Sequence, residues 1–247
     1  MPKFLPLLLP LALLLHGAVY AQPNPRQLAF ITDPLWLEAS LLPLLAAIER
    51  PQQPPELTNI GLAHCLNGGE FSLTPMQLQL GQRLRFSHCQ RDDWRYRGVL
   101  ELALDDEHGP AHRFNLALLP LVIREGQGPA LRIIWHEQGE FTPGGKPWRW
   151  QGEGSALISN EQPQFEVLEF YHLQRRLSLD GDNQLQQQLM ADILLDKRYQ
   201  LRHDSICQLN AEAMPRCRLL RLRLTEDQRR CWQWPDTNAD CQALVRH

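Results

Sequence analysis

Residues 57–104 read LTNIGLAHCLNGGEFSLTPMQLQLGQRLRFSHCQRDDWRYRGVLELAL, a run of short alternating segments bounded by cysteines and punctuated by glycines. Cys65 is followed by the turn-forming run Asn-Gly-Gly at 67–69, and Cys89 ends a strand-like segment that begins after Gly81. Apolar and polar residues that alternate between such turns are typical of antiparallel strands. The stretch therefore predicts neighbouring strands joined by a Cys65–Cys89 disulfide.

The same pattern continues to residue 224 and predicts a mainly β domain over residues 57–224. Short, evenly spaced strands separated by Gly, Pro, Asp or Asn indicate an antiparallel, strongly twisted sheet, sandwich or barrel. Across the Asp-Gly-Asp-Asn turn at 180–183, we expect Phe170 to lie opposite Ile193. The expected strands lie near 57–66, 70–79, 83–90, 96–104, 112–123, 130–136, 148–158, 165–179, 184–196, 198–208 and 217–224.

The spacing Cys-x-x-Gly-Gly, then Phe-x-x-Cys, then a glycine at Gly98 that opens another strand resembles a family of uncharacterised exported bacterial β-rich proteins. The resemblance covers Cys65 to Leu104. It implies export and β structure, and it implies no activity.

The first 21 residues have the form of a secretory signal peptide. Lys3 supplies the positive start, an apolar run extends from Phe4 to Leu15, and small residues precede an expected cut after Ala21. The apolar run is shorter than the roughly 20 residues of a membrane-spanning helix. We therefore expect residues 1–21 to be removed, and a periplasmic or secreted chain with no transmembrane span.

Residues 22–56 are expected to form a lead, a short apolar helix and a Pro-rich linker. Asp33-Pro34 is a typical helix start, and residues 35–48 are apolar on nearly all sides. Such a helix must be buried, so we expect it to dock on the sheet. Residues 225–247 lose the alternation and predict an irregular C-terminal cap.

Six cysteines in an exported chain predict three disulfides. Of the fifteen connectivities that six cysteines allow, we favour sequential pairing. The residues concerned are Cys65, Cys89, Cys207, Cys217, Cys231 and Cys241.

No catalytic motif is complete in this sequence. His64-Cys65 and His88-Cys89 would supply the ligand types of a zinc site, but an oxidising compartment favours a disulfide, so we expect neither metal nor cofactor. The cluster around His108 and His112 contains Gly109-Pro110 and predicts a polar turn, with cation binding or acid–base chemistry as the alternative. Ser155 lacks the glycine two residues later that a nucleophile elbow requires.

Two features are candidates for ligand binding. The pairs Trp148/Trp150 and Trp232/Trp234 could each present a double-ring platform, or could fill the core. Arginines that alternate with leucines near the C-terminus could bind anions, or could form a solvated strand face. These arginines are Arg216, Arg218, Arg221 and Arg223.

The charge distribution agrees with an anionic partner. The chain has a net charge of −3, yet residues 197–247 contain ten Lys+Arg against six Asp+Glu. We expect a non-catalytic binding or scaffolding protein of the bacterial envelope whose partner is an anionic envelope component, a polysaccharide or another envelope protein, and not nucleic acid. The alternative is a periplasmic hydrolase whose acid–base residues are dispersed His and Asp side chains. A pocket lined by two or more of His108, His112, His136, Asp105 and Asp106 would favour it.

Overall fold

The structure is a computed structural model of the 247-residue chain. It describes residues 32, 34–41, 65, 67–76, 81–104, 111–142, 148–160, 167–179, 184–195, 197–210, 213–226, 230–235 and 241–243. The expected signal peptide, the Pro-rich linker, the first expected strand and the turn at 105–110 lie outside the described residues.

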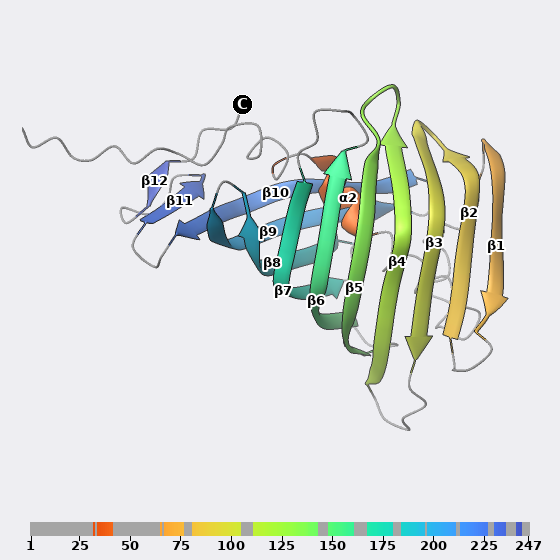
Figure 1. Ribbon diagram of the computed structural model, residues 1–247, viewed down its shortest axis with the longest axis horizontal. Helices are drawn as coiled ribbons and strands as arrows, with labels where there is room; N and C mark the ends of the chain where they lie inside the picture. The colour runs from red at the N-terminus through yellow and green to blue at the C-terminus, as the bar shows by residue number, and fades with distance from the viewer. Residues whose placement is uncertain are drawn as a thin grey trace, which may run out of the picture.

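The described chain forms one 12-stranded sheet in which each strand pairs with the next one in sequence (Figure 1). All neighbouring strands are antiparallel except the short β11–β12 pair. The strands are β1 (Gly68–Pro75), β2 (Gly81–Arg91), β3 (Trp94–Leu104), β4 (His112–Glu125), β5 (Leu131–Thr142), β6 (Trp148–Asn160), β7 (Val167–Leu179), β8 (Gln184–Leu194), β9 (Arg198–Asn210), β10 (Ala213–Glu226), β11 (Arg230–Trp234) and β12 (Gln242–Ala243). Of the three architectures that the sequence allowed, the structure is a single open, twisted sheet.

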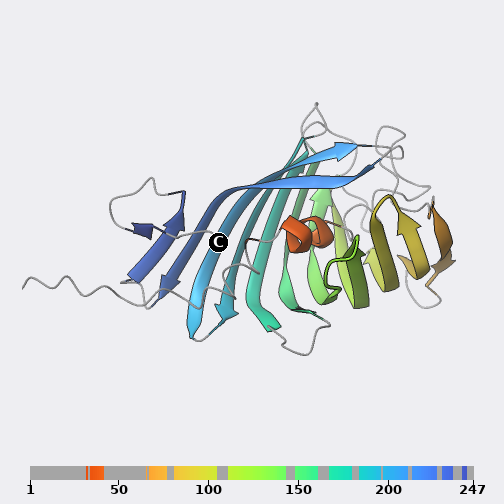
Figure 2. The ribbon, with the colours of Figure 1, turned by 90° about the horizontal axis from the view of Figure 1, so that it is seen from above.

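The sheet curves around helix α2 (Pro34–Ser40), which lies on its concave side (Figure 2). We call this concave side the inner face and the opposite side the outer face. Alternate residues of each strand point to the inner face and are buried, as in the inner-face leucines and isoleucine of β8, whereas their neighbours are more exposed. The period-two alternation in the sequence therefore reflects one buried and one solvated face of the sheet.

Register shifts interrupt the ladders of most of the long strands, and they let the sheet bend. Shifts occur between Phe86 and Cys89, between Arg97 and Leu100, and between Tyr171 and Gln174. Pro120 lies at another shift in the middle of β4, where the absence of an N–H group is tolerated. A single curved sheet results from strands that remain continuous through these bulges.

Helix α2 docks its apolar side chains on the inner face, as its sequence predicts. Trp36, Leu37 and Leu41 are buried, and the Trp36 ring lies 5.6 Å from that of Phe170, centroid to centroid. The described span of the helix is Pro34–Ser40, and Thr32 is also helical. The helix ends at Ser40 and Leu41 forms a turn, whereas residues 42–48, over which the sequence predicted a continuation, lie outside the described residues. No helix in the described part of the chain has the length and apolar character needed to cross a membrane.

The three disulfides pair sequentially, which confirms the favoured connectivity. Cys65–Cys89 ties the chain before β1 to β2, Cys207–Cys217 joins directly opposed residues of β9 and β10, and Cys231–Cys241 holds the C-terminal segment. The sequence predicts an irregular cap for this segment. The structure shows that it also contains strand β11, which pairs with β10 and extends the sheet. The predicted pairing of Phe170 with Ile193 is also confirmed.

One ionisable side chain of the core has no hydrogen-bond partner in the described part of the chain. His203 on β9 is fully buried, its imidazole packs edge-on against Trp36 at 5.3 Å, and neither ring nitrogen is paired. Burial lowers the pKa of His203 to about 4, because the charged imidazolium loses its hydration. The residue is therefore neutral in the folded protein at neutral pH.

His203 should make the protein less stable as the pH falls from about 6.5 towards 4. In this range the unfolded chain binds a proton that the folded chain cannot, so its contribution is complete above pH 6.5 and decreases below it. We expect the free energy of unfolding to fall by about 2 kcal/mol more between pH 7 and pH 5 than in His203→Leu. Urea unfolding at the two pH values measures this difference. An equal slope in the wild type and in His203→Leu would contradict the assignment.

Candidate functional site

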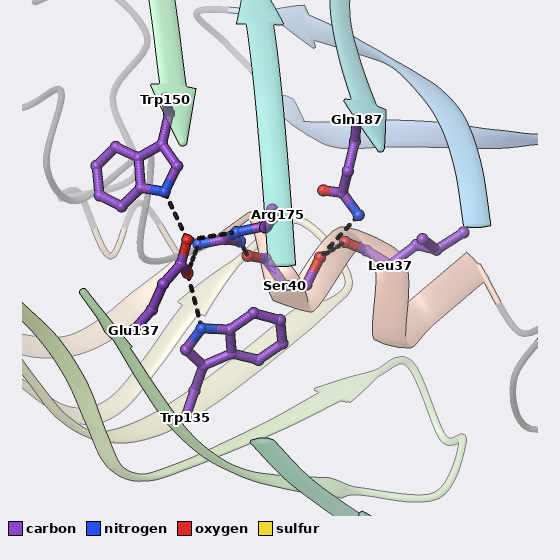
Figure 3. A network of polar contacts seen from close by, with 7 residues as sticks. All are labelled: Leu37, Ser40, Trp135, Glu137, Trp150, Arg175 and Gln187. Atoms are coloured by element: carbon purple, nitrogen blue, oxygen red, sulfur yellow. Dashed lines mark hydrogen bonds and ion pairs between the residues drawn. The ribbon is translucent and has the colours of Figure 1, made fainter. Parts of the chain in front are cut away.

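The inner face contains a buried ion pair that neighbouring tryptophans complete (Figure 3). Glu137 on β5 and Arg175 on β7 are both fully buried and form an ion pair, in which the Arg175 Nε also lies 3.2 Å from Glu137 Oε1. The indole N–H groups of Trp135 and Trp150 donate to the two carboxylate oxygens at 2.8 and 2.7 Å. Both charges are thus neutralised and hydrogen-bonded, which is the condition for burying them.

Arg175 extends this network to helix α2. Its guanidinium donates to the backbone carbonyl of Ser40, the last helical residue, and lies over the Trp135 ring at 4.8 Å. The Ser40 hydroxyl donates to the Leu37 carbonyl at 2.7 Å, and the Gln187 amide reaches that hydroxyl at 3.5 Å. A cation at a helix C-terminus satisfies an orphan carbonyl and complements the helix dipole. The network therefore fixes the helix on the sheet.

Glycines on β5 and β6 make room for the ion pair. Gly139 and Gly152 are opposite each other in the ladder and occupy inner-face positions. A Cβ atom at Gly152 would lie 2.0 Å from Glu137 Oε1, so any side chain there would displace the carboxylate. Strand glycines mark such close approaches.

Glu38 of the helix accepts a hydrogen bond from the backbone of β10. Its Oε1 atom accepts the backbone N–H of Cys217 at 3.2 Å, and Arg216 lies 3.7 Å from its other oxygen and 2.8 Å from Glu125. The hydrogen bond with Glu125 raises the pKa of Arg216. Arg216 therefore ties β10 to β4 and the helix, which for this arginine favours the alternative of a strand face paired with acidic neighbours.

The other three arginines of the predicted row share the outer face of β10. Arg218 and Arg221 are exposed, Arg223 is partly exposed, and none forms an ion pair with another residue in the described ranges. The strict alternation expected here is wrong, because a register shift between Leu219 and Arg221 places Leu219 in the core and leaves Leu220 42% exposed. The bulge keeps Arg218, Arg221 and Arg223 on the same face.

The outer face of β7–β10 is hollowed beside this row. A cavity of about 490 Å³ is lined by Arg202 and Arg223, which are directly opposite each other on β9 and β10, and by Asp192 and Gln174. Arg202 is paired with Asp204 at 3.4 Å. The depression is shallow and polar, and Arg223 is its unpaired cation.

A second polar row crosses the outer face of β5–β8. Ser155 lies opposite His136, and the shift between Gly154 and Ala156 brings it to the bulge at Tyr171 and His172. His172 Nδ1 lies 3.0 Å from Asp192, and its side chain is 82% exposed. The residue types are those of a nucleophile, a base and an orienting carboxylate, on a surface open to water.

Of the two alternatives for the tryptophan pairs, a platform or the core, the structure favours the core for two of the residues. Trp150 and Trp232 are buried in the core, Trp150 stacking on Phe114 at 3.7 Å between centroids, so neither can face a ligand. Trp234 is partly buried against the core. The side chain of Trp148 lies outside the described residues. The core alternative is correct for Trp150 and Trp232 because their inner-face positions are covered.

The proposed hydrolase cluster is only partly within the described ranges. His112 stacks on Phe141 and His136 is on the outer face of β5, whereas Asp105, Asp106 and His108 lie outside the described residues. Among the described side chains no group of His, Cys, Asp and Glu could hold a metal ion. The disulfide at Cys65–Cys89 removes the thiolates of the alternative zinc site.

Sequence reasoning missed Glu137 and Arg175. The signal that could have found them is a charged residue at a position that alternation assigns to the apolar face, since Glu137 follows Trp135 by two residues and Arg175 lies between Leu173 and Leu177. Two such residues of opposite charge predict each other as partners.

Comparison of the chain with family models, with curated proteins and with solved structures finds no match. The site is therefore interpreted from its own geometry.

Breaking the buried ion pair should strongly destabilise the protein. Arg175→Met leaves the Glu137 carboxylate buried without its counter-charge and should lower the free energy of unfolding by about 3–5 kcal/mol. The exposed pair of Arg113 and Glu140 is the matched control, and Arg113→Gln should cost less than about 1 kcal/mol. The double variant Glu137→Gln/Arg175→Met should be less unstable than the sum of its single changes. Additive losses in urea unfolding would show that the two residues do not act together.

Proposed function

We propose that this protein is an exported, non-catalytic binding or scaffolding protein of the bacterial envelope that engages an anionic envelope component through the outer face of β10. The observation that carries the proposal is a set of three outer-face arginines that form no ion pair with any residue the structure describes, Arg218, Arg221 and Arg223. Guanidinium groups in a row match the carboxylates or phosphates of an anionic polymer, because each can bind an oxyanion bidentately.

The rest of the structure supports a binding role for this surface. The buried Glu137–Arg175 network holds the helix on the inner face, so its charges serve the fold. Three disulfides are typical of an oxidising compartment, and the signal-like first 21 residues support export. A rigid sheet that displays fixed cations is suited to recognising a repeating anion.

A second candidate, a periplasmic hydrolase, is favoured by one observation. Ser155 lies beside the bulge that carries His172, and His172 contacts Asp192 at 3.0 Å. Against it, no hydrogen bond joins Ser155 to His172 in the described part of the chain, and the site excludes no water. Labelling of the intact protein by a fluorophosphonate, lost in Ser155→Ala and in His172→Gln, would establish the hydrolase; the binding proposal expects no labelling.

Arg221→Gln/Arg223→Gln should remove most binding to an acidic polysaccharide while leaving the melting temperature nearly unchanged. Exposed charges contribute little to stability, and their attraction for a polyanion is screened within about 8 Å at physiological ionic strength. Retention of the mature protein on immobilised polygalacturonate, measured over a salt gradient, reports the binding.

The control is Arg113→Gln, which removes one outer-face charge that is paired with Glu140. It should elute close to the wild type. Equal retention of the wild type and the double variant would refute a binding role for the β10 arginines. A large fall in melting temperature would show instead that they serve the fold.

A further inference from the structure

A groove on the outer face of β2–β5 is formed where the register shifts of three neighbouring strand pairs meet. The shifts fall at Ser87 and His88 on β2, at Gly98 on β3 and at Leu119 and Pro120 on β4. The resulting groove has a volume of about 460 Å³, and we call it the bulge groove.

Gly98 is required for this arrangement. Its φ angle is +144°, and a Cβ atom there would lie 2.3 Å from the Pro120 carbonyl oxygen. The backbones of β3 and β4 therefore approach each other at the floor of the groove more closely than any other residue would permit.

The lining of the bulge groove is basic and contains no acidic side chain. Arg85, Arg97, Arg132 and His88 contribute to it. Arg97 and Arg132 lie on either side of Val122 in one cross-strand row, and strand spacing puts their backbones about 10 Å apart. The other depressions on the outer face each contain a carboxylate, Glu140 or Asp192 for example.

Two arginines of the bulge groove have no ion pair in the described part of the chain. Arg85 and Arg132 form no ion pair with any described residue. Next to the groove, Arg95 and Arg124 are directly opposite each other, a like-charge pair that destabilises a sheet. Elsewhere on the same face Arg83 is paired with Glu101 at 2.6 Å. The positive charges of Arg85 and Arg132 are therefore available to an external anion.

The centre of the groove is apolar. Val99, Pro120 and Val122 are partly exposed and Leu119 is 40% exposed. A sugar polymer gains little from such a centre, whereas an amphiphile places its phosphate on the cations and its apolar part on the aliphatic side chains.

We propose that the bulge groove binds the phosphate headgroup of an anionic phospholipid at a membrane surface. Arg85, Arg97 and Arg132 contact the phosphate oxygens, and Leu119 contacts the apolar boundary beneath the headgroups. The site uses none of the β10 arginines and a different class of ligand, so it can fail while the proposed function stands, and the reverse is also true.

The test measures co-sedimentation of the mature, oxidised protein with phosphatidylcholine vesicles that contain about a third phosphatidylglycerol. Each arginine at a membrane surface strengthens binding by about 1 kcal/mol, so Arg85→Gln/Arg132→Gln should lower the partition constant roughly thirtyfold. The matched control Arg221→Gln/Arg223→Gln removes the same charge elsewhere on the outer face and should bind the vesicles as the wild type does.

A second variant tests the groove without removing an arginine. Leu119→Glu places a carboxylate at its centre and should also abolish vesicle binding, with circular dichroism confirming the native sheet. Soluble glycerol phosphate should not compete for the groove, because it lacks the apolar part. Full competition would show that the groove binds free phosphate and would overturn the proposal of a membrane ligand. Equal losses in both double variants, equal binding to vesicles of phosphatidylcholine alone, or no binding by the wild type would also overturn the proposal.

Discussion

The buried ion pair between Glu137 and Arg175 is the interaction on which the arrangement of sheet and helix depends. Moving a charge out of water costs several kcal/mol, so the pair is tolerated only because two indole N–H groups, a helix carbonyl and the opposite charge satisfy it together. These partners come from β5, β6, β7 and α2. Any arrangement that moves the helix off the sheet leaves a charged or polar group unsatisfied, so the network specifies the position of the helix as well as stabilising it.

Curvature follows from a second constraint, the need to wrap one sheet around this helix. Strands of 11 to 14 residues cannot remain flat and regular over that distance, and bulges take up the bend. A bulge also turns an additional side chain outward. Leu119, Leu220 and His172 all reach the outer face in this way. The bulges that curve the sheet around the helix therefore also shape the outer face.

The inner and outer faces of the sheet differ in how their charged side chains are paired. On the inner face the described charges are neutralised within the fold, as with Glu137, Arg175 and Glu38. On the outer face arginines outnumber carboxylates around the bulge groove and along β10, although the whole chain has a net charge of −3. This separation of charge is the physical basis of the proposal that anionic partners bind to the outer face.

Local sequence predicted much of the fold. The alternation and the turn residues located nearly all the long strands, because the residues of each strand are alternately buried and exposed. The Phe170–Ile193 pair was predicted from the position of the turn, and the three sequential disulfides from the spacing of the cysteines.

The sites were less accessible, because they depend on residues far apart in the chain. Arg216 looked equivalent to Arg218 until the fold brought Glu125 to it, and Trp150 looked like a platform until Phe114 covered it. Arg85 and Arg132 are 47 positions apart in the sequence and line one groove only because the sheet brings β2 and β5 to its two sides.

The sequence by itself determined the sheet, its alternation and its disulfides, because strands, turns and short loops are specified by neighbouring residues. Only the tertiary structure decided which face each bulge exposes, which charges are neutralised and which arginines are left for a partner. Register and curvature are cooperative properties of all the strands together, and no single segment encodes them.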